Sequence, residues 1–171
     1  MNAGMSPAER YAAARARAAA RSAAPRLEAF RERQEFPLDD FQLAACRALE
    51  AGRSVLVAAP TGAGKTIVAE FAVHLALAER RDKVFYTTPM KALSNQKYSE
   101  LAAEHGTGSV GLLTGDSNIN SGARVVVMTT EVLRNMLYAD SPLLRDLSYV
   151  VMDEVHYLAD RFRGAVWEEV I

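Results

Sequence analysis

Short apolar runs alternate with longer amphipathic stretches from residue 54 onward. The apolar runs predict five strands, at residues 54–59, 83–88, 110–113, 124–128 and 147–152. The stretches between them predict helices at 65–80, 91–104 and 131–139. Continuous apolar strands that alternate with helices indicate an α/β fold, in which helices cover both faces of a parallel sheet. Ligands of such sheets bind at the carboxyl ends of the strands.

The first 35 residues follow a different pattern and are assigned to an Ala/Arg-rich extension, helical or disordered, ahead of a domain at 36–171. Residues 12–24 are almost all Ala and Arg, with few large apolar side chains to bury, and Pro25 interrupts the helical pattern. A solvated helix is the favoured interpretation. A basic arm for nucleic acid and an organelle transit peptide are alternatives, and four Glu in this region argue against both.

Composition does not decide whether the chain binds nucleic acid, but it bears on the cellular compartment. The net charge is −1, but residues 1–35 carry seven Arg and four acidic residues, whereas the remainder carries thirteen basic and seventeen acidic residues. This balance neither supports nor excludes a nucleic-acid partner. The one cysteine, Cys46, cannot form an intramolecular disulfide and is expected in the core or on a helix surface. The sequence shows neither a membrane span nor a secretory signal, so we expect a cytoplasmic protein with no membrane partner.

A candidate phosphate-binding loop for ATP follows the first predicted strand. It reads Ala59-Pro60-Thr61-Gly62-Ala63-Gly64-Lys65-Thr66. The two glycines let backbone N–H groups approach phosphate, and the N-terminus of the next helix adds partial positive charge. We expect Lys65 to neutralise the outer phosphates and the Thr66 hydroxyl to ligate Mg²⁺. Ala59 stands where the general pattern has its first glycine.

An acidic pair, Asp153 and Glu154, directly follows the last predicted strand. An Asp at such a strand end can hold Mg²⁺, and the neighbouring Glu can polarise the attacking water. Taken alone, the pair is equally consistent with two acids that cap the next helix. Together with the phosphate loop it favours catalysis of phosphoryl transfer by Lys65, Asp153 and Glu154.

The two motifs AAPTGAGKT and DEVH together resemble the superfamily-two DExH helicases, whose ATP-binding domain has a RecA-like fold. The A-x-x-G-x-G-K-T form of the loop is the variant that these helicases carry. The segment 36–42 is similar to their adenine-recognition segment. By this resemblance Phe36 stacks on adenine and Gln42 hydrogen-bonds its edge, while residues 61–66 hold the phosphates.

Three further segments, 87–97, 111–116 and 128–137, resemble nucleic-acid-binding motifs of superkiller-type RNA helicases and HelY-like proteins. Residues 157–169 are similar to the tail of the DEVH box in the same group. Viewed singly, each segment is a plain strand–loop–helix; in this order and spacing they favour function. The resemblance implies contacts to single-stranded nucleic acid, RNA favoured over DNA, by these residues: Pro89, Lys91, Asn95, Gln96, Thr114, Gly115, Thr129 and Thr130.

The family pattern continues with a Ser-Ala-Thr segment and a second RecA-like domain that carries an arginine finger, which these residues do not include. The resemblance therefore implies an N-terminal fragment, truncated before the last elements of its first motor lobe. Because an arginine finger is worth about 10³–10⁵ in rate, we expect slow ATP hydrolysis and no unwinding by the chain alone. The alternatives are the same motor on DNA, a non-enzymatic ATP-dependent clamp, and an unrelated P-loop enzyme. A sheet without its last strand also leaves an exposed edge.

Overall fold

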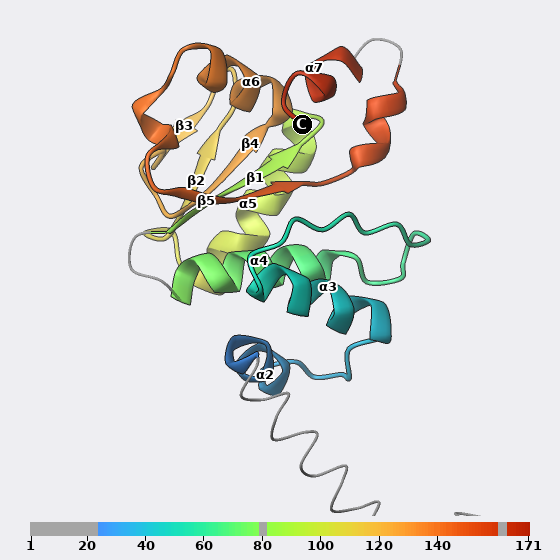
Figure 1. The fold of residues 1–171 in the computed structure, drawn as a ribbon. Coiled ribbons are helices and arrows are strands. Elements are labelled where there is room, and N and C mark those ends of the chain that lie inside the picture. The colour runs from blue at the N-terminus through green and yellow to red at the C-terminus, as the bar shows by residue number, and fades with distance from the viewer. Residues whose placement is uncertain (1–23, 79–81, 161–163) are drawn as a thin grey trace, which may run out of the picture. The chain divides into compact units, whose positions relative to one another are not determined.

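The computed structural model describes residues 24–78, 82–160 and 164–171 (Figure 1). The chain divides into two compact units, Met1–Phe71 and Ala72–Ile171, and the division falls inside helix α4 (Thr66–Ala78). Most of the predicted extension, residues 1–23, lies outside the described residues. The boundary at residue 35 therefore stays a prediction.

Helices α2 (Pro25–Glu32) and α3 (Asp40–Glu50) are the main elements of the first unit. Proline occupies the first turn of α2, where its missing N–H costs nothing. The carboxylate of Glu50 accepts hydrogen bonds from the backbone N–H groups of Arg26 and Leu27, both at 2.9 Å. A negative charge at a helix N-terminus is stabilising, so the end of α3 fixes the start of α2.

The core of the first unit is small and includes the cysteine. Phe30 of α2 meets Phe71 of α4 edge-on, with ring centroids 5.2 Å apart. Cys46 is fully buried, which confirms a core position. Burial, with the carboxylate of Glu50 nearby, raises the pKa of the Cys46 thiol to about 12.

The strand predicted at residues 54–59 is wrong for this structure. The segment is extended but pairs with no strand among the described residues, and the side chain of Leu56 is 77% exposed. Half-buried Val55 and Val57 alternate with exposed neighbours, so the two-residue period of a strand is retained. An alternating apolar pattern predicts which side chains are buried. It does not predict that another strand is available for backbone hydrogen bonding, which a β-ladder also requires.

The second unit contains a mixed sheet. Within the described residues it has five strands in the order β3-β2-β4-β1-β5. Their bounds are β1 Lys83–Thr88, β2 Val110–Leu113, β3 Asn118–Ile119, β4 Val125–Thr129 and β5 Leu147–Met152. Four strands are parallel, and β3 pairs antiparallel with β2 at one edge. This arrangement confirms the predicted α/β class.

Helices lie on both faces of this sheet, as predicted (Figure 1). Helix α5 (Lys91–His105) lies on the face of Tyr86, and α6 (Thr130–Tyr138) packs on the opposite face, where Phe85, Met128 and Leu133 share one core cluster. Strands β1 and β4 are buried almost throughout. At the other edge, β5 alternates between exposed and half-buried residues, in keeping with an open edge.

The bounds of β1, β2 and β5 agree with the sequence prediction, and those of α4, α5, α6 and β4 agree to within two residues. No bounds were predicted for α2 and α3. Strand β3 was not predicted, because two exposed residues carry no apolar pattern. The short helices η1 (Pro142–Leu144), η2 (Val155–Ala159) and α7 (Gly164–Glu168) were not predicted either. Each is too short for a helical period to show.

Candidate nucleotide and nucleic-acid sites

The Gly-rich loop of the first unit has the backbone that a phosphate site requires. Gly62 and Gly64 have φ angles of 81° and 76°, in the left-handed region that favours glycine. The Lys65 ammonium donates hydrogen bonds to the carbonyl oxygens of Ala59 and Pro60, at 2.7 and 2.9 Å. Lys65 and Thr66 are both exposed, so a ligand can reach the ammonium and the hydroxyl. A phosphate oxygen would compete with the two carbonyls for the ammonium.

Gln42 has a role that the sequence interpretation did not include. Its Oε1 accepts from the backbone N–H of Asp39 at 2.8 Å, and its Nε2 donates to the carbonyl oxygen of Gly64 at 2.9 Å. The side chain is 3% exposed. Gln42 therefore ties the start of α3 to the phosphate loop. The three-residue spacing from Asp39, typical of a capping box, could have indicated the first of these bonds. An adenine contact by Gln42 stays a prediction.

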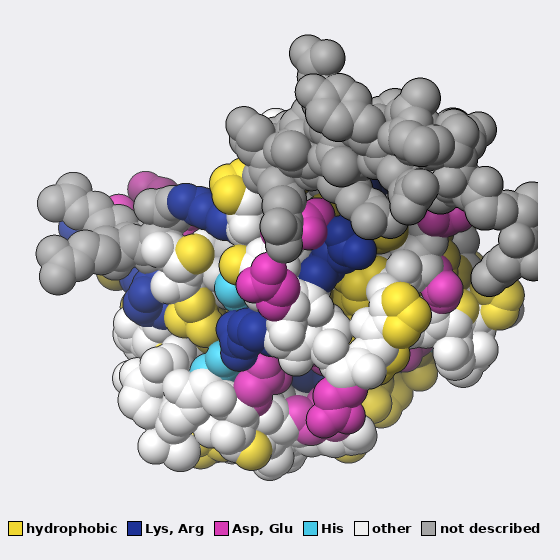
Figure 2. All heavy atoms as spheres, turned by 90° about the horizontal axis from the view of Figure 1, so that it is seen from below, with side chains coloured by type: hydrophobic (Ala, Val, Ile, Leu, Met, Phe, Trp, Pro, Cys, Tyr) yellow, Lys and Arg dark blue, Asp and Glu magenta, His cyan; other side chains and the backbone are white. Residues whose placement is uncertain are grey.

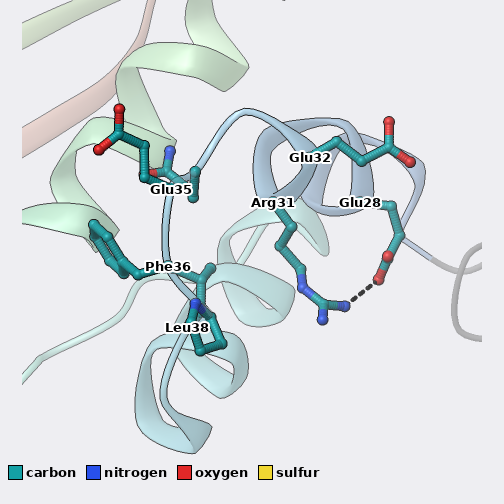
Figure 3. A pocket seen from close by; sticks show the side chains of 8 residues that line it. Glu28, Arg31, Glu32, Glu35, Phe36 and Leu38 are labelled. Carbon is teal, nitrogen blue, oxygen red and sulfur yellow. Dashed lines mark hydrogen bonds and ion pairs between the residues drawn. The ribbon is translucent and has the colours of Figure 1, made fainter.

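A cavity of about 380 Å³ lies beside Phe36, whose side chain is 52% exposed (Figure 3). Three carboxylates line it, with one guanidinium, that of Arg31, which is paired with Glu28 at 2.9 Å. An acidic lining disfavours phosphate. This cavity is therefore no phosphate site, and stacking of Phe36 on a base stays a prediction.

The acidic pair of the second unit lies where β5 ends. The backbone N–H of Asp153 donates to the Thr87 carbonyl oxygen at 3.0 Å, which continues the pairing of β5 with β1. Oδ2 of Asp153 accepts from the Tyr86 hydroxyl at 2.8 Å, and Oδ1 accepts from the backbone N–H of Glu154 at 2.9 Å. Glu154 is exposed, has a left-handed backbone with φ 57°, and its Oε2 lies 3.0 Å from Nδ1 of His156.

The two predicted magnesium ligands, Thr66 of the first unit and Asp153 of the second, each carry an oxygen donor. Mg²⁺ prefers oxygen ligands and is bound in such sites by one or two protein groups together with waters and substrate phosphates. A hydroxyl and a carboxylate are donors of that kind. Among the described residues, no cluster of three His, Cys, Asp or Glu side chains forms a metal site of its own.

The predicted nucleic-acid segments meet at the carboxyl ends of neighbouring strands. Strands β2, β4 and β1 are neighbours in the sheet and parallel, so their carboxyl ends lie side by side. A cavity of about 250 Å³ lies at these ends and is lined by Pro89, Met90, Lys91, Gly115, Thr129, Glu131, Val132 and Asn135. Four of the predicted contact residues therefore line one cavity. The segments that contribute them were identified separately in the sequence.

The other four predicted contacts lie outside this lining. Asn95 and Gln96 are exposed on α5, where the Gln96 amide donates to Glu100. Thr114 and Thr130 are buried, and their hydroxyls donate to the Asp116 carboxylate and to the Thr88 carbonyl oxygen. Met90, Glu131, Val132 and Asn135 line the cavity but were not predicted. All four lie within the segments 87–97 and 128–137, and this was the signal that could have identified them.

Lys91 is paired within the protein. Its ammonium lies 2.9 Å from Oδ2 of Asp116, and Oδ1 of the same carboxylate accepts from Thr114 at 2.9 Å. The hydrogen bond from Lys91, then that from Thr114, lowers the pKa of Asp116. The carboxylate occupies the position that a phosphate would take beside Lys91.

The face of the molecule that is drawn in Figure 2 carries mixed charge. On the face drawn in Figure 2, Lys and Arg side chains lie among Asp and Glu side chains and do not gather into a basic patch. At the strand ends, Lys91 and the N-termini of α5 and α6 are the candidates for phosphate contacts. No helix within the described residues is long and apolar enough to cross a membrane.

A phosphate loop, an acidic pair after β5 and a shared cavity at the strand ends are features of a nucleic-acid-dependent ATPase lobe. The sequence profile of the DEAD/DEAH box helicases matches residues 39–171, and the chain belongs to this family. Among curated proteins it is 69% identical over 145 residues to "Probable helicase HelY" of Mycobacterium tuberculosis (strain ATCC 25618 / H37Rv). It is 54% identical over 136 residues to "ATP-dependent RNA helicase mtr4" of Schizosaccharomyces pombe.

The matched region is a small part of these relatives. It covers 85% of this chain and 16% of the HelY protein, and 80% of this chain and 12% of the S. pombe protein. The chain thus spans about a sixth of the length of the HelY relative. Among solved structures, the helicase MrfA bound to DNA and AMPPNP aligns with a TM-score of 0.68 at 24% identity, over 84% of this chain and 22% of that one. That likeness supports the RecA-like fold.

Proposed function

We propose that the chain is the ATP-binding lobe of an ATP-dependent helicase that translocates along and unwinds RNA. The observation that carries the proposal is the cavity at the ends of β1, β2 and β4, where residues from all three predicted nucleic-acid segments meet. The names of several relatives, which include "Exosome RNA helicase MTR4" of Homo sapiens at 49% identity, support RNA as the substrate. The same motor on DNA is the other outcome of the test below.

Backbone and side-chain groups at this cavity suit a phosphate chain. Helices α5 and α6 begin there, at Lys91 and Thr130, and each N-terminus carries partial positive charge. Lys91 adds a full charge once it leaves Asp116. Contacts of this kind bind the backbone without reading bases, as a translocating motor needs.

The nucleotide chemistry assigns one role to each residue. Lys65 neutralises the outer phosphates, the Thr66 hydroxyl and the Asp153 carboxylate hold Mg²⁺, and Glu154 polarises the attacking water. The metal ion, when bound, offsets charge that develops on the transferred phosphoryl group. The Glu154 carboxylate lies 3.0 Å from Nδ1 of His156, just after the end of β5. We place the protein in the cytoplasm and expect the chain alone to hydrolyse ATP slowly; rapid RNA-stimulated turnover would contradict this.

Binding of single-stranded RNA to the variant Lys91→Gln tests the proposal. One phosphate contact to a single strand contributes about 0.7 to the slope of log K against log salt, so the slope should fall by about that amount. The control is Lys83→Gln at the opposite end of β1, which removes the same charge and should leave the slope unchanged.

Fluorescence anisotropy with an RNA and a DNA of the same sequence, over a range of salt concentrations, gives the affinities and both slopes. Tighter binding of RNA supports the proposed substrate, and tighter binding of DNA would favour the other motor. Equal slopes for the two lysine variants would remove Lys91 and its cavity from the nucleic-acid site.

A further inference from the structure

We propose that Tyr86 is a positioning residue for Asp153, because it fixes the orientation of the carboxylate to which the proposed function assigns Mg²⁺. The Tyr86 hydroxyl donates to Oδ2 of Asp153 at 2.8 Å, although the two residues are 67 positions apart in the chain. The inference rests on the proposed nucleotide function.

The register of the sheet explains why this tyrosine reaches that carboxylate. Tyr86 pairs with Val151 in the parallel ladder between β1 and β5. Side chains two residues apart in a strand point to the same face, so Asp153, two positions beyond Val151, is on the face of Tyr86. The long phenol ring spans this diagonal. Tyr86 is 1% exposed, and β1 is held between β4 and β5, so the donor starts from a fixed backbone.

The Asp153 carboxylate is held at both oxygens. The backbone N–H of Glu154 donates to Oδ1 at 2.9 Å, and the Tyr86 hydroxyl takes Oδ2. Each carboxylate oxygen can accept more than one hydrogen bond, so both keep capacity for water or a metal ion. Outer partners of this kind orient metal ligands, and their loss typically costs about 10–100-fold in metal affinity or activity.

The tyrosine ring is itself restrained from the α5 side. The Lys97 ammonium lies 5.6 Å from the ring centroid, within the range of a cation–π contact. Lys97 is in turn paired with Glu100 at 2.5 Å. The ring is therefore fixed by α5 above it and by the sheet below, and its hydroxyl points at Asp153.

The test measures how binding of a fluorescent ATP analogue to the 171-residue chain depends on Mg²⁺ concentration. Tyr86→Phe removes one hydroxyl and should raise the half-saturating Mg²⁺ concentration by about tenfold or more. Nucleotide affinity in EDTA should stay as in the unchanged chain, which a general loss of structure would not allow. The matched control, Tyr98→Phe on α5, removes a hydroxyl from a half-buried tyrosine and should leave the Mg²⁺ dependence unchanged.

The variant Asp153→Ala separates the two levels of the proposal. If it leaves the Mg²⁺ dependence unchanged, the magnesium role of Asp153 fails and the role of Tyr86 fails with it. If Asp153→Ala shifts the dependence but Tyr86→Phe does not, the positioning role is refuted and the nucleotide function stands.

Circular dichroism and urea unfolding check that each variant is folded. Should Tyr86→Phe fail to fold, Lys97→Met replaces it, since it keeps the hydroxyl but removes the restraint on the ring. A rise of a few-fold in half-saturating Mg²⁺ then supports the proposal, and an unchanged value refutes it.

Discussion

Replacement of Gln42 by Ala should loosen the phosphate loop of the first unit. The change removes the bond from the Asp39 N–H at 2.8 Å and the bond to the Gly64 carbonyl at 2.9 Å. Loss of a helix cap costs about 0.5–2 kcal/mol, and loss of one further hydrogen bond costs about 0.5–1.5 kcal/mol. We therefore expect the free energy of unfolding to fall by about 1–3 kcal/mol.

Urea unfolding followed by circular dichroism measures this loss, and amide exchange over residues 59–66 locates it. The control Gln96→Ala removes an amide from an exposed face of α5, where it bonds Glu100. Exposed helix pairs contribute about 0.2–0.5 kcal/mol, so this variant should unfold almost as the unchanged chain does. Equal losses in the two variants would refute the view that Gln42 secures the loop.

A second variant, Gln42→Glu, tests the bond to Gly64 separately from the bond to Asp39, because only the bond to Gly64 then depends on pH. The new carboxyl can still accept from Asp39, but when ionised it faces the carbonyl oxygen of Gly64 without a proton to donate. That contact and burial favour the neutral form, so the folded pKa lies above the ordinary value of about 4.3. Stability is then fully recovered below pH 4 and lost as the pH rises through the raised pKa. A variant whose stability relative to the unchanged chain does not rise on acidification would contradict the assigned contact.

Two further predictions concern Cys46 and Asp116. Because the pKa of Cys46 is raised to about 12, its alkylation by iodoacetamide at pH 8 should be about a thousandfold slower in the folded chain than in urea; similar rates would refute the buried placement. The same shift makes the folded state less stable as the pH rises above the ordinary thiol value, since only the unfolded thiol ionises there. Asp116→Asn should tighten RNA binding by a few-fold, because an exposed ion pair is weak and Lys91 becomes available. Asp140→Asn, beyond the far end of α6, removes the same charge and should not change the anisotropy titration.

Strands β1, β2, β4 and β5 could be predicted because each has an apolar run in the sequence, whereas the two exposed residues of β3 form no such run. Strand β1 lies between two partners and is buried from Val84 onward, so its apolar run and its extent coincide. The segment 54–59 has an equally apolar run, yet Leu56 is 77% exposed. Pairing depends on a backbone elsewhere in the chain, and a local pattern carries no information about it.

The residues of the candidate sites could be predicted from sequence motifs. The contacts that hold or group these residues could not. Lys65, Thr66, Asp153 and Glu154 could be named from spacing, because each motif is contiguous in the chain. The bond from Tyr86 to Asp153 joins residues 67 positions apart, and it follows only once the register of β1 and β5 is known. In the same way, the strand order brings Gly115 and Thr129 to one cavity.

Position 154 has different optima for stability and for chemistry. Glu154 holds a left-handed backbone at φ 57°, a conformation that costs a residue with a Cβ atom about 1–2 kcal/mol relative to the right-handed region. A search for stabilising substitutions guided by backbone geometry would therefore select glycine here. That choice would remove the carboxylate assigned to the attacking water, so a more stable lobe would be a worse catalyst. Engineering of this protein for thermal stability should leave residue 154 unchanged and gain stability elsewhere.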